Sequence, residues 1–124
     1  MIRLGELDPA TPFPAQLQST GDDGPVTLFN TITAPEGHVP EVIQAWTADA
    51  AFMKAAPGFV RAQLYQGTAG SNVLVNIAVW ETVEQLREAF SSPEFQTNLA
   101  HYPDGTVATP HLFHKRAVAG ICVG

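Results

Sequence analysis

Three side chains that could take part in a reaction lie in two segments whose other residues are typical of buried strands. Asn30 lies on the apolar face of segment 26–33, and Asn76 and Trp80 share one face of segment 73–80. Asparagine is disfavoured inside strands, and burying its amide without partners costs a few kcal/mol. Amide N–H groups can stabilise an oxyanion, and an indole provides one N–H donor and a flat ring for stacking. Asn30, Asn76 and Trp80 are therefore the candidate catalytic residues.

Two interpretations of these residues stay open on the sequence alone. In one, the amides satisfy each other or the backbone, and Trp80 belongs to the core. In the other, they line a small-molecule pocket, because the small Ala78 leaves room between Asn76 and Trp80. The substrate-binding residues expected around that pocket are Trp46, Met53, Leu86, Phe90 and Arg61.

The elements that must position these residues follow from hydrophobic periodicity and turn signals. The predicted strands are 26–33, 59–66, 73–80 and 111–118, and the predicted helices are 39–54, 83–90 and about 93–99. Residues 67–72 read as a hairpin loop and 102–110 as a longer loop. The order β-α-β-β-α-β predicts an α+β, ferredoxin-like fold, with a four-stranded antiparallel sheet covered by helices on one face. The first and third strands are neighbours there, so the three candidate residues should converge under the helices.

The other face of this predicted sheet carries an apolar patch that the helices leave uncovered. A row of exposed valines is unfavourable in water and predicts a partner surface, for which a second copy of the chain is the simplest partner. We therefore expect a homodimer through the sheet face formed by Phe29, Val73, Val75, Ile77 and Val79.

The chain divides into three expected parts. Residues 1–24 are expected to be an extended arm that ends in a loop at 21–24, because three prolines and a Gly-Asp-Asp-Gly cluster interrupt any period. Residues 25–119 form the predicted domain, and residues 120–124 are a C-terminal tail.

Composition narrows the class of partner. The 124 residues suit one domain, and 6 Lys and Arg against 12 Asp and Glu give a formal charge of −6. A nucleic acid or an anionic membrane surface is therefore not an expected partner. No apolar run approaches the roughly 20 residues that cross a bilayer. Cys122 is the single cysteine, so no intrachain disulfide can form, and we expect a soluble cytoplasmic protein. The sequence has no zinc-ligand spacing, and we expect no metal.

Four stretches carry a resemblance to a known family. They are Val-Thr-Leu-Phe-Asn at 26–30, Ala-Pro-Gly-Phe-Val at 56–60, Val-Asn-Ile-Ala-Val-Trp-Glu-Thr at 75–82 and Ser-Pro-Glu-Phe at 92–95. Over about residues 24–117 the chain resembles the antibiotic biosynthesis monooxygenase family. The resemblance implies a dimeric α/β barrel, in which two sheets pack face to face.

The same resemblance implies an activity. Some family members are cofactor-independent oxygenases of aromatic polyketide anthrones, in which a first-strand asparagine and an Asn-x-x-x-Trp pair are functional. Asn30, Asn76 and Trp80 occupy the matching positions. Haem-degrading relatives carry a histidine ten residues after this tryptophan, where this chain has Phe90, and another subgroup carries a tyrosine at the position of Leu86.

The expected reaction is oxidation of an anthrone- or hydroquinone-like aromatic substrate to a quinone by O₂, with no cofactor. Asn30 and Asn76 would stabilise the enolate, and Trp80 would orient a peroxide or stack on the substrate. The general base is not identified from the sequence. A non-oxidative polyketide cyclase or isomerase and a non-catalytic binding protein on the same fold are the alternatives.

Overall fold

The computed structural model describes residues 2–19 and 24–124. Its elements are β1 (Arg3–Leu4), α1 (Phe13–Leu17), β2 (Val26–Thr33), α2 (Val39–Lys54), β3 (Phe59–Gln66), β4 (Val73–Trp80), α3 (Val83–Phe90), α4 (Pro93–Asn98), the 3₁₀ turn η1 (Leu99–His101) and β5 (Val107–Phe113). The strands form one sheet in the order β1-β5-β2-β4-β3, antiparallel except for the β1–β5 pair. The predicted α+β, ferredoxin-like class is confirmed, with β1 as an additional edge strand.

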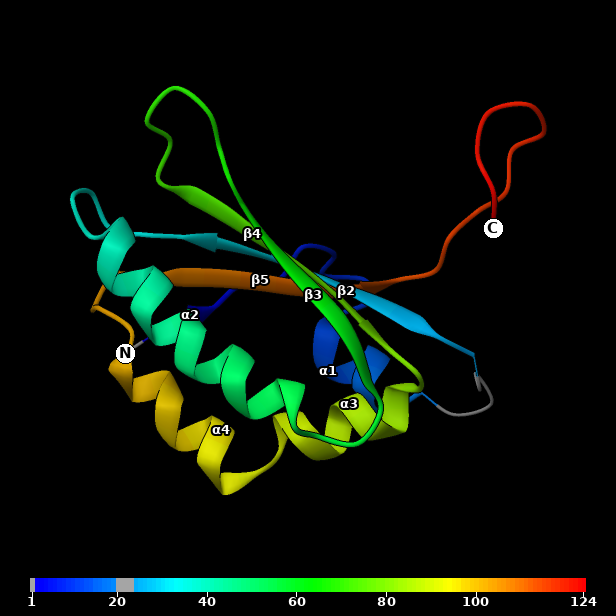
Figure 1. The fold of residues 1–124 in the computed structure, drawn as a ribbon, viewed down its shortest axis with the longest axis horizontal. Coiled ribbons are helices and arrows are strands. Elements are labelled where there is room, and N and C mark those ends of the chain that lie inside the picture. Colours follow the sequence, from blue (N-terminus) through cyan, green and yellow to red (C-terminus); the bar gives the residue numbers. More distant parts are fainter. Residues whose placement is uncertain (1, 20–23) are drawn as a thin grey trace.

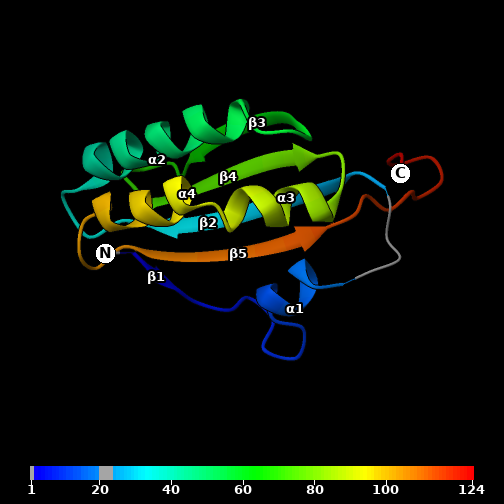
Figure 2. The same cartoon turned by 90° about the horizontal axis from the view of Figure 1, so that it is seen from below.

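The molecule has two layers. Helices α2, α3 and α4 cover one face of the sheet, while β1 and α1 follow the β5 side (Figure 2). The opposite face carries no helix of the described chain, and the C-terminal hairpin projects away from the body (Figure 1). None of the helices in residues 2–19 and 24–124 has the length and apolar character needed to cross a membrane.

The buried core separates into two clusters under the helices. One contains Trp80 and Leu86 and is completed by Phe13 and Leu17 of the short α1. The other contains residues of α2, β2, β4 and the end of the η1 turn: Ile32, Val42, Leu74 and Tyr102 among them. The sheet is continuous beneath both clusters, so the space between them lies directly above the middle of β2 and β4.

Local sequence signals explain the ends of the elements on this face. The Thr82 hydroxyl accepts the backbone N–H of Gln85 at 3.1 Å and caps α3, and the Ser92 hydroxyl caps α4 in the same way. Gly58 has a φ of +89°, and a Cβ there would lie 2.3 Å from the Gln85 side chain. Glycine is therefore required where β3 begins beneath α3.

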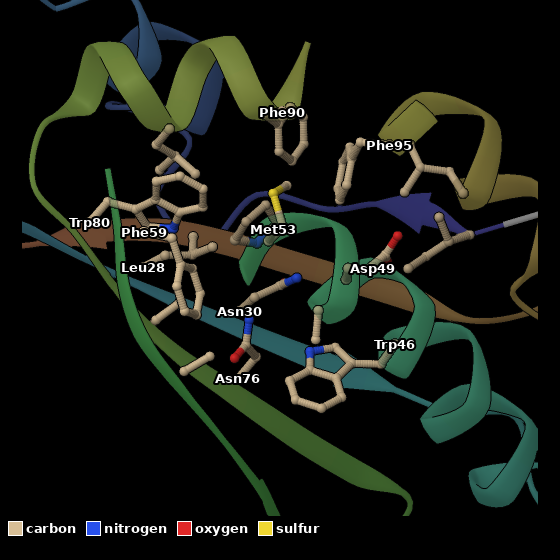
Figure 3. A pocket seen from close by; sticks show the side chains of 18 of the residues that line it. Leu28, Asn30, Trp46, Asp49, Met53, Phe59, Asn76, Trp80, Phe90 and Phe95 are labelled. Atoms are coloured by element: carbon tan, nitrogen blue, oxygen red, sulfur yellow. The ribbon is translucent and has the colours of Figure 1, made fainter. Parts of the chain in front are cut away.

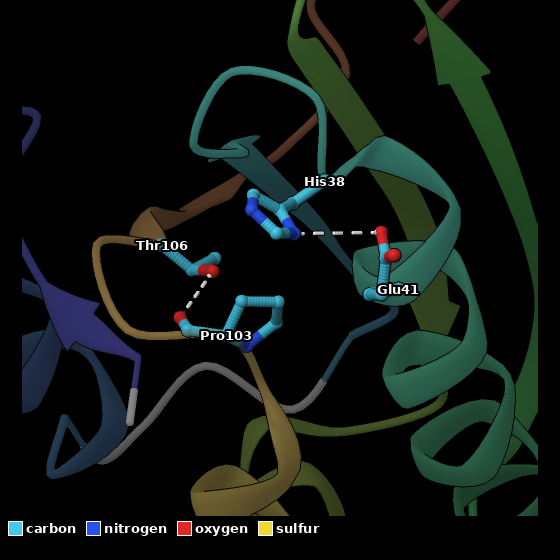
Figure 4. Close-up of polar contacts among 4 residues, drawn as sticks. All are labelled: His38, Glu41, Pro103 and Thr106. Atoms are coloured by element: carbon cyan, nitrogen blue, oxygen red, sulfur yellow. Dashed lines mark hydrogen bonds and ion pairs between the residues drawn. The ribbon is translucent and has the colours of Figure 1, made fainter.

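The start of α2 lies beside the turn that leads into β5 (Figure 4). His38 precedes the helix and stands 3.7 Å from Glu41 within its first turn, with both side chains about half exposed. The Thr106 hydroxyl donates to the Pro103 carbonyl at 2.7 Å and closes the turn. These contacts belong to the outer end of the fold, away from the candidate residues.

The last strand differs from the prediction: it spans Val107–Phe113 rather than 111–118, and the preceding loop is correspondingly shorter. The predicted loop extends to Pro110, and a proline cannot donate to a strand ladder. Peptide groups alternate in direction along a strand, and those of Ala108 and Leu112 bond toward the N-terminal arm. Pro110 is two residues from each of them, so its backbone groups point to the same side as theirs. The N–H that proline lacks would therefore point toward the arm, and the ladder between β2 and β5 loses no hydrogen bond.

The N-terminal arm also differs from the extended segment that we expected. The backbone N–H groups of Arg3 and Gly5 donate to the carbonyls of Thr106 and Ala108 at 2.8 and 2.7 Å, which makes β1 a strand. Residues 13–17 form a helix too short to show a period, held by two buried side chains four residues apart. The loop expected at 21–24 falls largely on residues outside the described part of the chain.

Gln16 pairs with β5 as a strand residue would. Its side-chain oxygen accepts the Leu112 N–H at 2.9 Å, and its side-chain nitrogen donates to the Leu112 carbonyl at 3.0 Å and lies 3.2 Å from His111 Nε2. An unpaired sheet edge is a site for unwanted pairing with other chains. Together β1 and Gln16 cover the edge of β5 on both sides of Pro110.

We predict that Gln16→Ala lowers the free energy of unfolding by about 1–3 kcal/mol, because both backbone groups of Leu112 lose their partners. Urea-induced unfolding followed by circular dichroism measures the change. Gln18→Ala is the matched control, since Gln18 is exposed at the end of α1. Equal unfolding midpoints for the two variants would contradict this role of Gln16.

Candidate functional site

A cavity of about 70 Å³ lies between the sheet and the helices, at the junction of the two core clusters. The sheet contributes its floor, which includes Asn30, Asn76 and Trp80. Helices α2, α3 and α4 contribute an apolar roof: Trp46, Met53, Leu86, Phe90 and Phe95 (Figure 3). Three candidate catalytic residues and four of the five expected substrate-binding residues are thus brought together around one space.

The two asparagines are direct cross-strand neighbours. Asn30 pairs with Asn76 in the β2–β4 ladder, and the same row continues to Pro110 on β5 and to Leu64 on β3. Neither flanking residue has a side-chain hydrogen-bonding group. Within the described chain, the side-chain oxygens of Asn30 and Asn76 are buried and have no hydrogen-bond partner. The site therefore holds two amides that the protein itself leaves incompletely satisfied.

Trp80 forms one end of the floor. Its side chain is 1% exposed, and its ring packs edge-on against Phe59 with centroids 5.6 Å apart. Phe90 and Phe95 pack with centroids 4.7 Å apart above the cavity. Aromatic groups on both sides of a narrow space suit a flat, apolar ligand.

A carboxylate faces this cavity from α2. Asp49 is 7% exposed, and its Oδ2 accepts the Tyr102 hydroxyl at 2.5 Å while its Oδ1 accepts the Asn98 amide at 2.5 Å. Asn98 also donates to the Ala45 carbonyl, and its own oxygen lies 2.7 Å from Nδ1 of the exposed His101. Asp49 is among the residues that line the cavity, and Figure 3 shows its side chain extending from α2 toward the α4 side.

Burial controls the ionisation of this pair. Desolvation raises the pKa of Asp49 above its usual value, and the hydrogen bonds from Tyr102 and Asn98 oppose that rise in part. Burial and the neighbouring carboxylate raise the pKa of Tyr102 beyond its ordinary range, so its hydroxyl stays protonated. Asp49 is thus a carboxyl group with increased basicity beside a neutral donor.

Comparison with known proteins adds the family. Residues 25–100 match the antibiotic biosynthesis monooxygenase family. The deoxynogalonate monooxygenase of Streptomyces nogalater is 34% identical over 82 residues, which cover 66% of this chain and 69% of that one. The chain belongs to the antibiotic biosynthesis monooxygenase family. The predictions of this family and of the monooxygenase class of enzyme are confirmed.

Two solved structures have a similar fold. SnoaB of Streptomyces nogalater, a cofactor-independent oxygenase, is 30% identical and has a TM-score of 0.70, covering 78% of this chain and 98% of its own. A protein from Pseudomonas aeruginosa has a TM-score of 0.64 at 22% identity, over 78% of this chain and all of its own length (100%), and supports the fold alone.

Arg61 is the expected substrate-binding residue that does not line the cavity. It lies on β3 with its side chain on the opposite face of the sheet, where it borders a shallow hollow of about 440 Å³ together with Phe29, Ile77 and Val79. An irregularity in the β3–β4 pairing between Phe59 and Arg61 changes the alternation at this point. The assignment of Arg61 to the cavity was therefore wrong for this chain taken alone.

Sequence reasoning missed Asp49, and it offered Tyr102, which follows the second helix, only as a residue at the rim of the pocket. A signal for Asp49 was present, because it follows Trp46 by three residues and precedes Met53 by four, within the apolar stripe of α2. An acidic residue inside such a stripe must be buried or must face a polar space. The place of Tyr102 after the second helix indicates a rim residue, but no sequence signal indicates its hydrogen bond with Asp49.

We predict that Asn76→Leu raises the free energy of unfolding by about 1–3 kcal/mol, because it removes a buried oxygen that has no partner. Asn98→Leu is the matched control and lowers the same quantity, since the Asn98 amide bonds Asp49 and the Ala45 carbonyl. Chemical denaturation of both variants measures the changes. A similar destabilisation in both would mean that Asn76 serves the fold.

Proposed function

We propose that this chain is a cofactor-independent monooxygenase that oxidises an anthrone- or hydroquinone-like aromatic substrate to a quinone with O₂. The observation that carries the proposal is the pair of incompletely satisfied amides, Asn30 and Asn76, set side by side in an apolar, aromatic cavity. The likeness to SnoaB, which is a cofactor-independent oxygenase, supports the same reaction class.

The chemistry needs little from the protein beyond placement and charge stabilisation. An anthrone loses a methylene proton to give an enolate, which transfers an electron to O₂ and then combines with it as a peroxide. Loss of water from the hydroperoxide gives the quinone, so one anthrone and one O₂ yield one quinone and one water. Amide donors from Asn30 and Asn76 stabilise the enolate oxygen, each by about 3–4 kcal/mol.

The amide oxygens favour a hydroxylated substrate. A buried acceptor without a partner is costly, and a phenolic O–H is a donor that an aromatic substrate can supply. The side-chain oxygens of Asn30 and Asn76 can accept such groups while their N–H groups face the enolate. Trp80 closes the end of the space, where its indole can stack on the ring or donate to the peroxide.

The cavity must widen for a substrate of this size. Its volume of about 70 Å³ is far below the ~300–1,000 Å³ typical of small-molecule pockets. The half-buried Met53, Phe90 and Trp46 border it on the helical side, and methionine adapts readily to a new shape. We propose that these side chains rotate when the aromatic substrate enters.

The proposed quaternary state is a homodimer through the uncovered sheet face. Phe29, Val75, Ile77 and Val79 are only half-buried there, and Phe29 packs edge-on with Phe113 at 5.0 Å. Val73 is 38% exposed at the start of β4. A second copy, packed face to face, would remove this apolar surface from water and would cover Arg61 as well.

The proposed activity predicts oxygen uptake by the purified, metal-free protein with dithranol, well above the spontaneous rate. Asn76→Ala lowers the turnover rate by about 10²–10³-fold, because one oxyanion donor is lost. Trp80→Phe lowers it too, since the indole N–H is removed. An oxygen electrode measures the rate, and Asn72→Ala in the β3–β4 loop is a control expected to match wild type.

The alternatives give different outcomes in this experiment. No uptake above background, by a folded protein that still binds dithranol, would favour a non-oxidative cyclase or isomerase, or a binding protein. Equal uptake by wild type and both site variants would remove Asn76 and Trp80 from the mechanism.

The proposed dimer predicts that Ile77→Glu sediments as a monomer, because a charge is placed at the centre of the apolar face. Ala51→Glu carries the same charge on the exposed side of α2 and should sediment as wild type. Analytical ultracentrifugation at micromolar concentration distinguishes the two. A monomeric wild type, or a dimeric Ile77→Glu, would contradict the proposed interface.

A further inference from the structure

The proposed reaction needs a base to take the first proton, and the cavity lining narrows the candidates. Of the described residues that line the cavity, the titratable ones are Asp49 and Tyr102. Tyr102 has a pKa raised by burial and by the adjacent carboxylate, so it serves as a donor and not as a base. Asp49 is left as the group that can accept a proton inside the cavity.

We propose that Asp49 is the general base that removes the methylene proton of the substrate, with Tyr102 and Asn98 as positioning residues. This inference rests on the substrate class given by the proposed function. In the step, a carbon–hydrogen bond of the methylene group breaks and its electron pair moves into the enolate. The proton goes to the Asp49 carboxylate, and the enolate oxygen faces the amides of Asn30 and Asn76.

The hydrogen bonds of Asp49 do not use all of its acceptor sites, so it can still accept a proton. An ionised carboxylate offers about four acceptor sites, and two of them are taken by Tyr102 and Asn98, one on each oxygen. Both contacts are 2.5 Å and come from residues after α3, so they fix the carboxylate from the side away from α2. The other acceptor sites of the two oxygens take no hydrogen bond from the described residues, and Asp49 lines the cavity where the substrate proton would be.

The surroundings also adjust the basicity of Asp49. Burial raises its pKa, which brings a carboxylate closer to the pH at which a general base works best. The electrostatic interaction with the nearby His101 lowers this pKa as well, by less than the hydrogen bonds from Tyr102 and Asn98 do. The other lining residues, from the sheet and from α3 and α4, are uncharged, and Glu94 of α4 is exposed to solvent.

A purely structural role is the competing explanation, because the same contacts tie α2 to the segment 98–102. That role predicts a loss of stability when the contacts are removed. It predicts no change in the rate of proton transfer from the substrate in a variant that is still folded. The decisive experiment must therefore follow the proton itself, and must do so without depending on oxygen chemistry.

The test is hydrogen–deuterium exchange of the dithranol methylene group in D₂O without oxygen, followed by proton nuclear magnetic resonance. Wild type should accelerate the exchange above the buffer rate, and Asp49→Asn should lower the protein-catalysed rate by about 100-fold or more. Glu94→Gln, which removes an exposed acid on α4, should exchange as wild type. Fluorescence titration should give Asp49→Asn the dithranol affinity of wild type.

A second variant separates basicity from folding. Tyr102→Phe removes one hydrogen bond that lowers the pKa of Asp49, so that pKa rises further. The acid limb of the exchange rate should move to higher pH, while the rate on the plateau changes little. Loss of stability without a move of the acid limb would assign Tyr102 to structure alone.

The outcomes separate this inference from the proposed function. Exchange that needs Asp49, without oxygen uptake under air, supports the base and overturns the oxidation. Oxygen uptake together with wild-type exchange by Asp49→Asn overturns the base and leaves the oxidation standing. A wild type that fails to accelerate exchange also overturns the inference.

Discussion

The antiparallel pairing of β2 with β4 is the constraint on which the site depends. It sets Val26 opposite Trp80 and Asn30 opposite Asn76, with the small Ala78 opposite Leu28 between them. Side chains alternate between faces along a strand, so a slip of one residue between β2 and β4 would put Asn30 and Asn76 on opposite faces of the sheet. The fully buried Ile32 and Leu74, paired with each other on the same ladder, resist such a slip.

The site weakens the core that supports it. The amides interrupt the apolar floor, and the cavity above them separates one cluster around Trp80 and Leu86 from another around Ile32 and Val42. Apolar side chains in the same row would close that gap and would leave no polar atom unsatisfied. The hydrogen bonds of Asp49 with Tyr102 and Asn98 offset part of this loss, because they join α2 to the segment 98–102.

Much of the fold could be predicted because its signals are local and periodic. The strands 26–33 and 73–80 and the helices 39–54 and 83–90 have the predicted bounds, and their alternation placed Asn30, Asn76 and Trp80 on one face. Pro110 concealed the start of β5, since its tolerance depends on which way a peptide group points in the assembled sheet. The hydrogen bond between Tyr102 and Asp49 could not be found for a similar reason, because the two residues are 53 positions apart in the chain.

The arm that covers β5 also limits how copies of this chain can associate. In the described chain, β1 and the Gln16 amide occupy the outer side of β5, so the sheet has one full-length open edge, β3, and one edge of two residues, β1. Growth of a continuous sheet through many molecules requires two open edges on each of them. The two-residue β1 offers few backbone groups to a further strand, so the arm makes sheet growth through this edge unfavourable.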